Sequence, residues 1–314
     1  MTKPRVYIIC GVHNGLKYTQ GLLSCLKKQN YKEVKTIIID DGSTDDTFKY
    51  LARRKPPFKI LRGDGSLWWT GAVYWGVEEA LKDAKSNDYI LTINNDCTFN
   101  NTYISDLVTS SQKNGGAIVG SLAIDAKNKK EIWDGGVTID WKRALFVAKS
   151  YKNIDDLPSN RKYDESIDTL STKGTLYPVE VFKKIGNFNK KKLPHYLSDY
   201  EFACRAKRYG FKLVLSYQAI VYNDIERTGM GDSMPKIITY SKLWQFYFDR
   251  KSKLNIIDNY YFINLCFPLK YKPLNYLFLL MKFFYLLSFT FPFVIFRPFI
   301  LFTKKLIISN EKPL

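Results

Sequence analysis

The chain has 314 residues, enough for one large domain or for one domain with an appendage, and its 46% hydrophobic content argues against disorder as the main state. Lys and Arg number 48 against 30 Asp and Glu, so the formal net charge is +18 and polyanions such as nucleic acid, anionic lipid or phosphorylated substrates are favoured partners. Five cysteines without a C-x-x-C pair and only two histidines argue against a zinc site. The odd cysteine count and an N-terminus without a signal-type apolar stretch are typical of a reducing cytoplasm.

The first hundred residues predict strands that alternate with helices. Apolar, β-rich runs predict four strands, at Val6–Cys10, Val34–Ile39, Phe58–Leu61 and Tyr89–Ile93. Apolar spacing and capping residues predict helices over residues 16–29, 44–51 and 72–84. This alternation is typical of parallel βαβ units, and polar groups gather after the carboxyl ends of three of the strands, where ligands bind in open α/β sheets.

The middle of the chain is less regular. Strands are predicted over residues 117–124, 136–139 and 212–221. Helices are predicted over residues 179–185 and 199–209, and a loop over residues 155–166.

The composition changes after about residue 230. Residues 273–306 hold long apolar runs that Lys282 and Pro292 interrupt. The longest uncharged run, Phe283–Phe296, is shorter than the roughly 20 apolar residues that a membrane-spanning helix needs. Interfacial helices or a re-entrant hairpin are therefore expected rather than a clean span. The alternative is a hydrophobic arm that packs on the rest of the chain or on a second copy.

Carboxylates follow two of the predicted strands. Asp40 and Asp41 come before Gly42, where a carboxylate can accept a hydrogen bond from a nucleotide base or a ribose hydroxyl. An ordinary strand-to-helix turn explains these residues equally well. Asp96 follows the fourth strand, where it is either a turn residue or a ligand for a hard divalent cation that also binds substrate phosphates.

A third group of charged residues starts the helix predicted over residues 199–209. Asp199 and Glu201 lie where the helix macrodipole favours negative charge, so N-terminal capping alone could explain them. In the functional interpretation, one of the two carboxylates is a general base that removes the proton of an acceptor hydroxyl.

Taken in order, these motifs resemble those of family 2 glycosyltransferases, over about residues 4–225. The segments that carry the resemblance are Val6–Asn14, Ile37–Asp45, Gly63–Gly76, Asn94–Asp96, Gly174–Phe188 and Leu197–Arg205. The ordered set is specific, although no single motif is. Within the family, the chain is most similar to bacterial rhamnosyltransferase-like enzymes of surface polysaccharide assembly.

The resemblance implies the architecture and the reaction. It implies an α/β GT-A fold with a mainly parallel central sheet, which residues 1–230 would form as a catalytic domain. Residues 1–100 would be its nucleotide-binding half and residues 101–230 its acceptor-binding half. Residues 231–314 would be a hydrophobic helical extension that associates with the membrane or with a second copy. The implied reaction is metal-dependent, inverting transfer of a sugar from a nucleotide diphosphate to a lipid-linked or glycan acceptor.

The resemblance also implies roles for individual residues. Asp199 would be the catalytic base, supported by Glu201 and Arg205. Asp96 would bind Mg²⁺ or Mn²⁺, and Asn223, where the family often has a histidine, is either a weak ligand or has no such role. The nucleotide-binding residues would be Gly11, His13, Asn14, Asp40, Asp41 and Asn95. The donor or acceptor pocket would include Trp68, Trp69, Gly71, Gly174 and His195.

The chain departs from the family pattern around the metal and the base. Asn94 and Asn95 replace acidic residues often found before Asp96, and Ser198 replaces the usual Glu before the base. Two other classes of protein were weighed: a nucleotide-sugar-binding protein without transfer activity, and a basic nucleic-acid-binding protein. The retained carboxylates favour transfer, and no recognition-helix, RNP or zinc pattern points to nucleic acid. A cytoplasmic location on the inner face of the cell membrane is expected.

Overall fold

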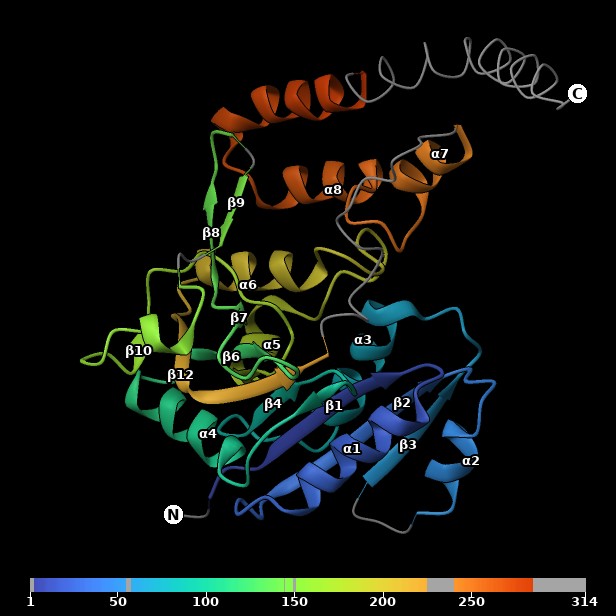
Figure 1. The fold of residues 1–314 in the computed structure, drawn as a ribbon, viewed down its shortest axis with the longest axis vertical. Helices are drawn as coiled ribbons and strands as arrows, with labels where there is room; N and C mark the ends of the chain where they lie inside the picture. The colour runs from blue at the N-terminus through green and yellow to red at the C-terminus, as the bar shows by residue number, and fades with distance from the viewer. Residues whose placement is uncertain (1–2, 55–57, 144, 149–150, 225–239, 285–314) are drawn as a thin grey trace, which may run out of the picture. The chain divides into compact units, whose positions relative to one another are not determined.

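The computed structural model describes residues 3–54, 58–143, 145–148, 151–224 and 240–284 (Figure 1). Contacts divide the chain into two compact units, residues 1–228 and 229–314. Every strand that the structure describes belongs to the first unit.

A ten-stranded mixed sheet forms the centre of the first unit. Along its main path the strands follow the order β10-β12-β6-β11-β4-β1-β2-β3, while β5 pairs with β12 and β7 pairs with β6. Their bounds are β1 Val6–Val12, β2 Val34–Asp41, β3 Phe58–Gly63, β4 Tyr89–Thr92, β5 Cys97–Thr98, β6 Ile118–Asp125, β7 Ile132–Asp134, β10 Tyr163–Asp164, β11 Thr175–Pro178 and β12 Leu213–Asn223. Neighbours β3, β2, β1 and β4 run parallel, as do β6 and β12. The predicted α/β fold with a mainly parallel sheet is confirmed.

Helices cover both faces of this sheet. The helices of the first unit are α1 Leu16–Lys27, α2 Thr47–Ala52, α3 Trp68–Leu81, α4 Tyr103–Lys113, α5 Val179–Ile185 and α6 Ser198–Arg208. Successive residues of β1 point to opposite faces, because side chains alternate along a strand. Tyr7 and Ile9 pack in the core with α3, α5 and α6, whereas Ile8 packs in the core with α1, α2 and α4.

The predicted elements differ from the structure in several places. Helix α3 begins at Trp68, four residues before its predicted start. Helix α4 and strands β5, β7, β11 and β9 Leu145–Ala148 were not predicted. The loop expected over residues 155–166 contains β10, and a 3₁₀ turn, Ile154–Asp156, overlaps its start.

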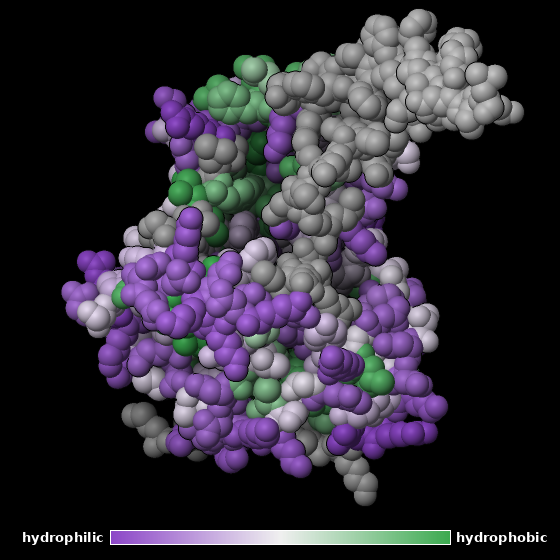
Figure 2. Space-filling view, viewed as in Figure 1, coloured by the Kyte–Doolittle hydropathy of each residue, from purple (hydrophilic) through white to green (hydrophobic). Residues whose placement is uncertain are grey.

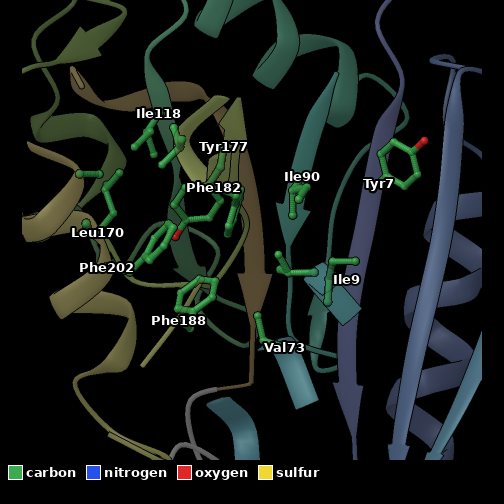
Figure 3. Packing of buried hydrophobic residues seen from close by; sticks show 14 of the residues in the cluster. Tyr7, Ile9, Val73, Ile90, Ile118, Leu170, Tyr177, Phe182, Phe188 and Phe202 are labelled. Atoms are coloured by element: carbon green, nitrogen blue, oxygen red, sulfur yellow. The ribbon is translucent and has the colours of Figure 1, made fainter. Parts of the chain in front are cut away.

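An aromatic cluster fixes α6 against the sheet (Figure 3). The ring of Phe202 in α6 stacks on Phe188 at 4.3 Å between centroids and on Phe182 of α5 at 5.0 Å. Tyr177 of β11 meets the same ring edge-on at 5.4 Å. Such pairs stabilise by about 0.5–1.5 kcal/mol each beyond their buried area. The start of α6, one turn before Phe202, is therefore held by the core.

A separate two-stranded sheet, β8 Val137–Asp140 with β9 Leu145–Ala148, lies outside the main sheet. Its strands are antiparallel. Phe146 is exposed, and its ring lies 5.3 Å from that of Tyr200 in α6. The hairpin therefore contacts the first turn of α6.

The second unit is helical where the structure describes it. It contains α7 Tyr240–Phe248, α8 Ile256–Cys266, the 3₁₀ turn Leu269–Tyr271 and a helix over residues 272–284. Apolar residues gather on the last of these segments, as the green area of Figure 2 shows. The exposed apolar side chains of this helix and of the 3₁₀ turn before it are Leu269, Leu277, Phe278, Leu280, Met281 and Phe284. Within the described ranges, no helix has both the length and the hydropathy to cross a membrane. The rest of the predicted hydrophobic arm, residues 285–306, lies outside those ranges.

The packing around Gly174 predicts a large cost for adding one methyl group. Gly174 has φ +87°, and a Cβ there would lie 2.0 Å from Tyr103 Oη and 2.8 Å from Ser121 Oγ. Gly210 has a matching φ of +89° but open space around its Cβ position. We expect Gly174→Ala to lower the free energy of unfolding by about 3 kcal/mol or more, because backbone strain and overpacking add. Gly210→Ala should cost about 1 kcal/mol, from the backbone alone.

Urea unfolding of both variants, followed by circular dichroism, measures this difference. Equal costs for the two substitutions would show that the contacts of Gly174 with Tyr103 and Ser121 relax freely.

Candidate functional site

Asp41 joins the end of β2 to the start of α3. It is only 6% exposed, and its two carboxylate oxygens accept hydrogen bonds from the backbone N–H groups of Gly65 (2.8 Å) and Trp68 (3.0 Å). A Cβ on Gly42 or Gly63 would clash with this arrangement, at 2.6 Å from Gly65 N and from Asp41 Oδ1 respectively. Asp41 thus caps α3 from a different element, and a role in binding base or ribose stays a prediction.

Asp40 and the end of β1 complete this part of the sheet edge. Asp40 is fully buried and accepts hydrogen bonds from Arg62 Nη1 at 3.0 Å and from Ser43 N at 2.9 Å. Nδ1 of His13 donates to the backbone oxygen of Asp41 at 2.6 Å, and Asn14 Oδ1 accepts the backbone N–H of Thr44 at 2.7 Å. These contacts tie the loop after β1 to the loop after β2.

Both asparagines before Asp96 use their side chains to hold helices. Trp69 Nε1 of α3 donates to Asn94 Oδ1 at 3.1 Å, and Asn95 Nδ2 donates to Thr19 Oγ1 of α1 at 3.2 Å. An amide serves here where a carboxylate could not, because Asn95 acts as a donor. The end of β4 is therefore fixed between α1 and α3, and it positions Asp96.

Asp96 and Asn223 are the candidate cation ligands. Strand pairing puts Asn223 opposite Cys97, the residue after Asp96. Asn223 is fully buried, and its Oδ1 has no hydrogen-bond partner among the described residues. That oxygen fits a ligand for a hard cation, which takes few protein carboxylates when substrate phosphates supply the rest. In the described ranges, no group of three or more His, Cys, Asp or Glu could hold a metal ion.

Asp199 lies in the first turn of α6, where burial dominates its chemistry. Its oxygens accept hydrogen bonds from the N–H groups of Tyr200 (2.9 Å) and Thr172 (3.3 Å). Burial, together with the charge of Asp134, nevertheless raises the pKa of the Asp199 carboxyl from 3.8 to about 6. A carboxyl with such a pKa is suited to general-base catalysis near neutral pH.

Glu201 and Arg205 form a separate, structural pair. The guanidinium of Arg205 contacts both oxygens of Glu201, at 2.8 and 3.1 Å, and also donates to the carbonyls of Ile185 and Asn187. Glu201 is only 2% exposed. Arg205 therefore fixes α6 to the loop after α5, and its contacts are with Glu201 rather than with Asp199.

The loop before α6 connects the start of that helix to α3. Thr70 N of α3 donates to the carbonyl of Pro194 at 3.1 Å, and the ring of Trp68 lies edge-on to His195 at 5.6 Å. Trp69 also packs on Phe188 at 5.9 Å. The expected pocket residues Trp68, Trp69 and His195 thus come together between α3 and α6.

Three expected site glycines have packing roles. A Cβ on Gly11 would lie 3.1 Å from that of Ala72, so this glycine lets α3 approach β1. Gly174 fits against Tyr103 and Ser121, and Gly71 lies over Leu67. Contact of these glycines with donor or acceptor stays a prediction.

Three of the described residues have positive φ without being glycine, and all three border the candidate site. They are Asn14 at 48°, Trp68 at 56° and Leu197 at 63°. Strained backbone of this kind collects at functional sites, where the surrounding structure enforces it. Asn14 follows β1, Trp68 starts α3 and Leu197 precedes α6, so each fixes one of the elements that meet here.

Sequence reasoning missed Asp134 and Thr172. Both act on Asp199, one through its charge and one through a hydrogen bond. The sequence Trp133-Asp-Gly-Gly136 has the same form as Asp41–Gly42, an acidic residue before glycine, and could have drawn attention to Asp134. Thr172 carries no such signal.

Comparison with known proteins identifies the family. The model of the family "Glycosyl transferase family 2" matches residues 7–186, more than half of the chain. The chain therefore belongs to glycosyl transferase family 2, as the resemblance of its motifs implied. A 52-residue stretch, 16% of the chain, is 44% identical to an uncharacterized glycosyltransferase of Haemophilus influenzae and covers 20% of that relative.

Solved structures show the same fold. The mannosyltransferase PcManGT from Pyrobaculum calidifontis, in complex with GDP-Man and Mn²⁺, matches with a TM-score of 0.52 at 14% identity, over 73% of this chain and 59% of that one. GalNAc-T7, with UDP, GalNAc and Mn²⁺, matches with a TM-score of 0.58 at 14% identity, over 84% of this chain and 52% of that one. At this identity the likeness supports the GT-A fold alone. The chain spans between half and three fifths of these two proteins.

The environment of Asp199 predicts a specific pH dependence. We expect kcat/KM to fall as the pH drops through about 6, because protonation removes the base. Asp134→Asn removes a like charge and should lower the pKa of Asp199, so the fall should move to lower pH. Asp140→Asn, in β8, is the control. If Asp134→Asn left the inflection of the pH profile at the same pH, the charge of Asp134 would not affect the pKa of Asp199.

Stability should depend on the same carboxyl. Its pKa in the folded state is raised above 3.8, so its favourable contribution is complete below about 4 and is lost as the pH rises through about 6. Asp199→Asn should therefore increase the free energy of unfolding at pH 8, by on the order of 2 kcal/mol, and not at pH 4. Denaturant titrations at the two pH values measure the difference.

Proposed function

We propose that the protein transfers a sugar from a nucleotide diphosphate to a hydroxyl group of the acceptor, with inversion at the anomeric carbon. What supports this most is the desolvated carboxylate of Asp199, with its pKa of about 6, in a unit of the family 2 fold. A base that is largely ionised at neutral pH, yet far more basic than an exposed Asp, can take the proton of an attacking hydroxyl. A single base of this kind suits a direct displacement at the anomeric carbon.

The other residues would hold and orient the donor. Asp96 and the buried Oδ1 of Asn223 would hold Mg²⁺ or Mn²⁺, and the bound cation would neutralise charge on the diphosphate. Trp68, Trp69 and His195 would line the sugar-binding region. Fixed positions of donor and base supply much of the rate enhancement in such reactions.

The donor is best identified by a screen. The similar structures named above hold GDP-Man in one case and UDP in the other, each with Mn²⁺. GDP-, UDP- and dTDP-linked sugars, dTDP-rhamnose among them, should be offered with Mn²⁺ or Mg²⁺ while released nucleoside diphosphate is measured. Release that depends on acceptor and cation with one of these donors is the expected result.

Two substitutions separate donor binding from chemistry. Asp96→Ala should weaken cation-dependent binding of nucleoside diphosphate by roughly 10-fold or more. Mutation of a residue that only hydrogen-bonds to a metal ligand already lowers metal affinity by about that much. Asp199→Asn should keep this binding but lower kcat by about 10²- to 10⁴-fold. Calorimetry and single-turnover kinetics measure the two effects.

Asp83→Asn serves as the control. Asp83 follows α3, and its exposed carboxylate forms a salt bridge with Lys35. Wild-type turnover by Asp199→Asn would assign the proton to another group. Glu201 is a poor substitute, because Arg205 occupies both of its oxygens.

We further propose that the acceptor is lipid-linked and that the second unit places the enzyme on the inner, cytoplasmic face of the cell membrane, for surface polysaccharide synthesis. Exposed apolar side chains on the helix over residues 272–284 support contact with an apolar boundary. The net charge of +18 adds attraction to anionic lipid. Burial of this surface by a second copy is the alternative.

Liposome flotation tests this proposal. The full-length protein should float with vesicles that contain anionic lipid, and combined substitution of Leu277, Leu280, Met281 and Phe284 by Gln should abolish flotation. It should also reduce transfer to a lipid-linked acceptor more than donor hydrolysis. Tyr209→Gln changes an exposed aromatic residue of the first unit and is the matched control. A full-length protein that stays at the bottom as a detergent-free dimer would make the surface an oligomer interface.

A further inference from the structure

Lys173 lies two residues before a strand that begins beside the end of β4. Strand β11 runs antiparallel to β4, with its first residue, Thr175, opposite Thr92, the last residue of β4. The chain continues from Thr92 to Asn94 and Asp96, so Lys173 and Asp96 both lie at this edge of the sheet. Thr172, the neighbour of Lys173, donates a hydrogen bond to Asp199. The short segment that carries Lys173 therefore reaches both the candidate cation site and the base.

The side chain of Lys173 is held in a defined position. Its ammonium lies 4.9 Å from the ring centroid of Trp133, within the range of a cation–π interaction. Trp133 precedes Asp134, whose charge acts on Asp199. The ammonium also acts electrostatically on Cys97, the residue after Asp96, so its charge reaches the end of β4.

The candidate cation site is poor in protein charge, which leaves a task for this ammonium. Asn94 and Asn95 are neutral, so Asp96 is the acidic residue of its motif. When the bond between the anomeric carbon and the β-phosphate oxygen breaks, its electron pair stays on the diphosphate, which gains a negative charge. The acceptor oxygen forms the new bond and its proton passes to Asp199. Lys173 would keep its own proton and supply only charge and hydrogen bonds.

We propose that Lys173, held over Trp133, binds the diphosphate of the sugar donor and stabilises the charge that develops on it during transfer. This inference rests on the proposed function, because it requires a nucleotide diphosphate donor. A lipid-linked acceptor also carries phosphate, so the test must separate the two sources.

Calorimetry with nucleoside diphosphate and monophosphate, in the presence of Mn²⁺, tests the proposal on the full chain. Lys173→Met should weaken diphosphate binding by about 10- to 100-fold, the range expected for lost hydrogen bonds from a charged group, and leave monophosphate binding nearly unchanged. Lys173→Arg should retain most of the diphosphate affinity. Trp133→Leu should cost less, by about 3-fold, since it removes only the cation–π contact.

Lys184→Met is the matched control. Lys184 also lies over an aromatic ring, that of Phe211 at 5.3 Å, but Phe211 comes before the start of β12, away from Asn223 at the other end of that strand. Equal loss of diphosphate and monophosphate affinity, or no loss in Lys173→Met, would overturn the proposal. The proposal would also be overturned if Lys173→Met raised the KM for the acceptor and left the KM for the donor unchanged. That result would assign Lys173 to binding of the acceptor phosphate. If the wild-type protein itself binds no nucleoside diphosphate, the proposed function fails instead.

Discussion

The geometry of the site depends on one carboxylate, that of Asp41, which caps helix α3 although it belongs to strand β2. Asp41, at the end of β2, accepts the backbone N–H groups of Gly65 and Trp68, where negative charge is favoured by the dipole of α3. This contact fixes the first turn of α3. The same first turn of α3 holds the loop before α6, because Thr70 N donates to the carbonyl of Pro194 and the ring of Trp68 packs on His195. The position of the candidate base therefore depends on strand β2, more than 150 residues away in the chain.

Local patterns predict the parts of this structure that local physics determines. The β-branched run of β2 and the acidic residues at strand ends are visible in the sequence, and so is the charged start of α6. Strand β11 was missed because it has only four residues and ends in Pro178; pairing with β4 and β6 makes it a strand. The early start of α3 was missed because its cap, Asp41, lies in another element. Asp134 and Thr172 act on Asp199 only through tertiary structure, so no spacing in the sequence could pair them with it.

The two carboxylates in the first turn of α6 show how environment separates chemical roles. Glu201 is buried, and the fork of Arg205 occupies both of its oxygens, so its contacts serve the packing of α6. The described hydrogen bonds to Asp199 come from neutral groups, and burial together with the charge of Asp134 raises its pKa to about 6. These different surroundings support the proposal that Asp199, rather than Glu201, is the base.

The same reasoning explains how a site with few acidic residues can serve the proposed reaction. The side chains of Asn94 and Asn95 hydrogen-bond to α3 and α1, and as neutral amides they put no negative charge at the end of β4. An incoming diphosphate then meets one carboxylate, Asp96, instead of several, and the repulsion between donor and protein is smaller. A cation held by fewer protein charges also keeps more of its own charge for the phosphates. In the proposed reaction, the amides weaken binding of the cation to the free protein. They favour binding of the diphosphate together with its cation, and the ammonium of Lys173 favours diphosphate binding as well.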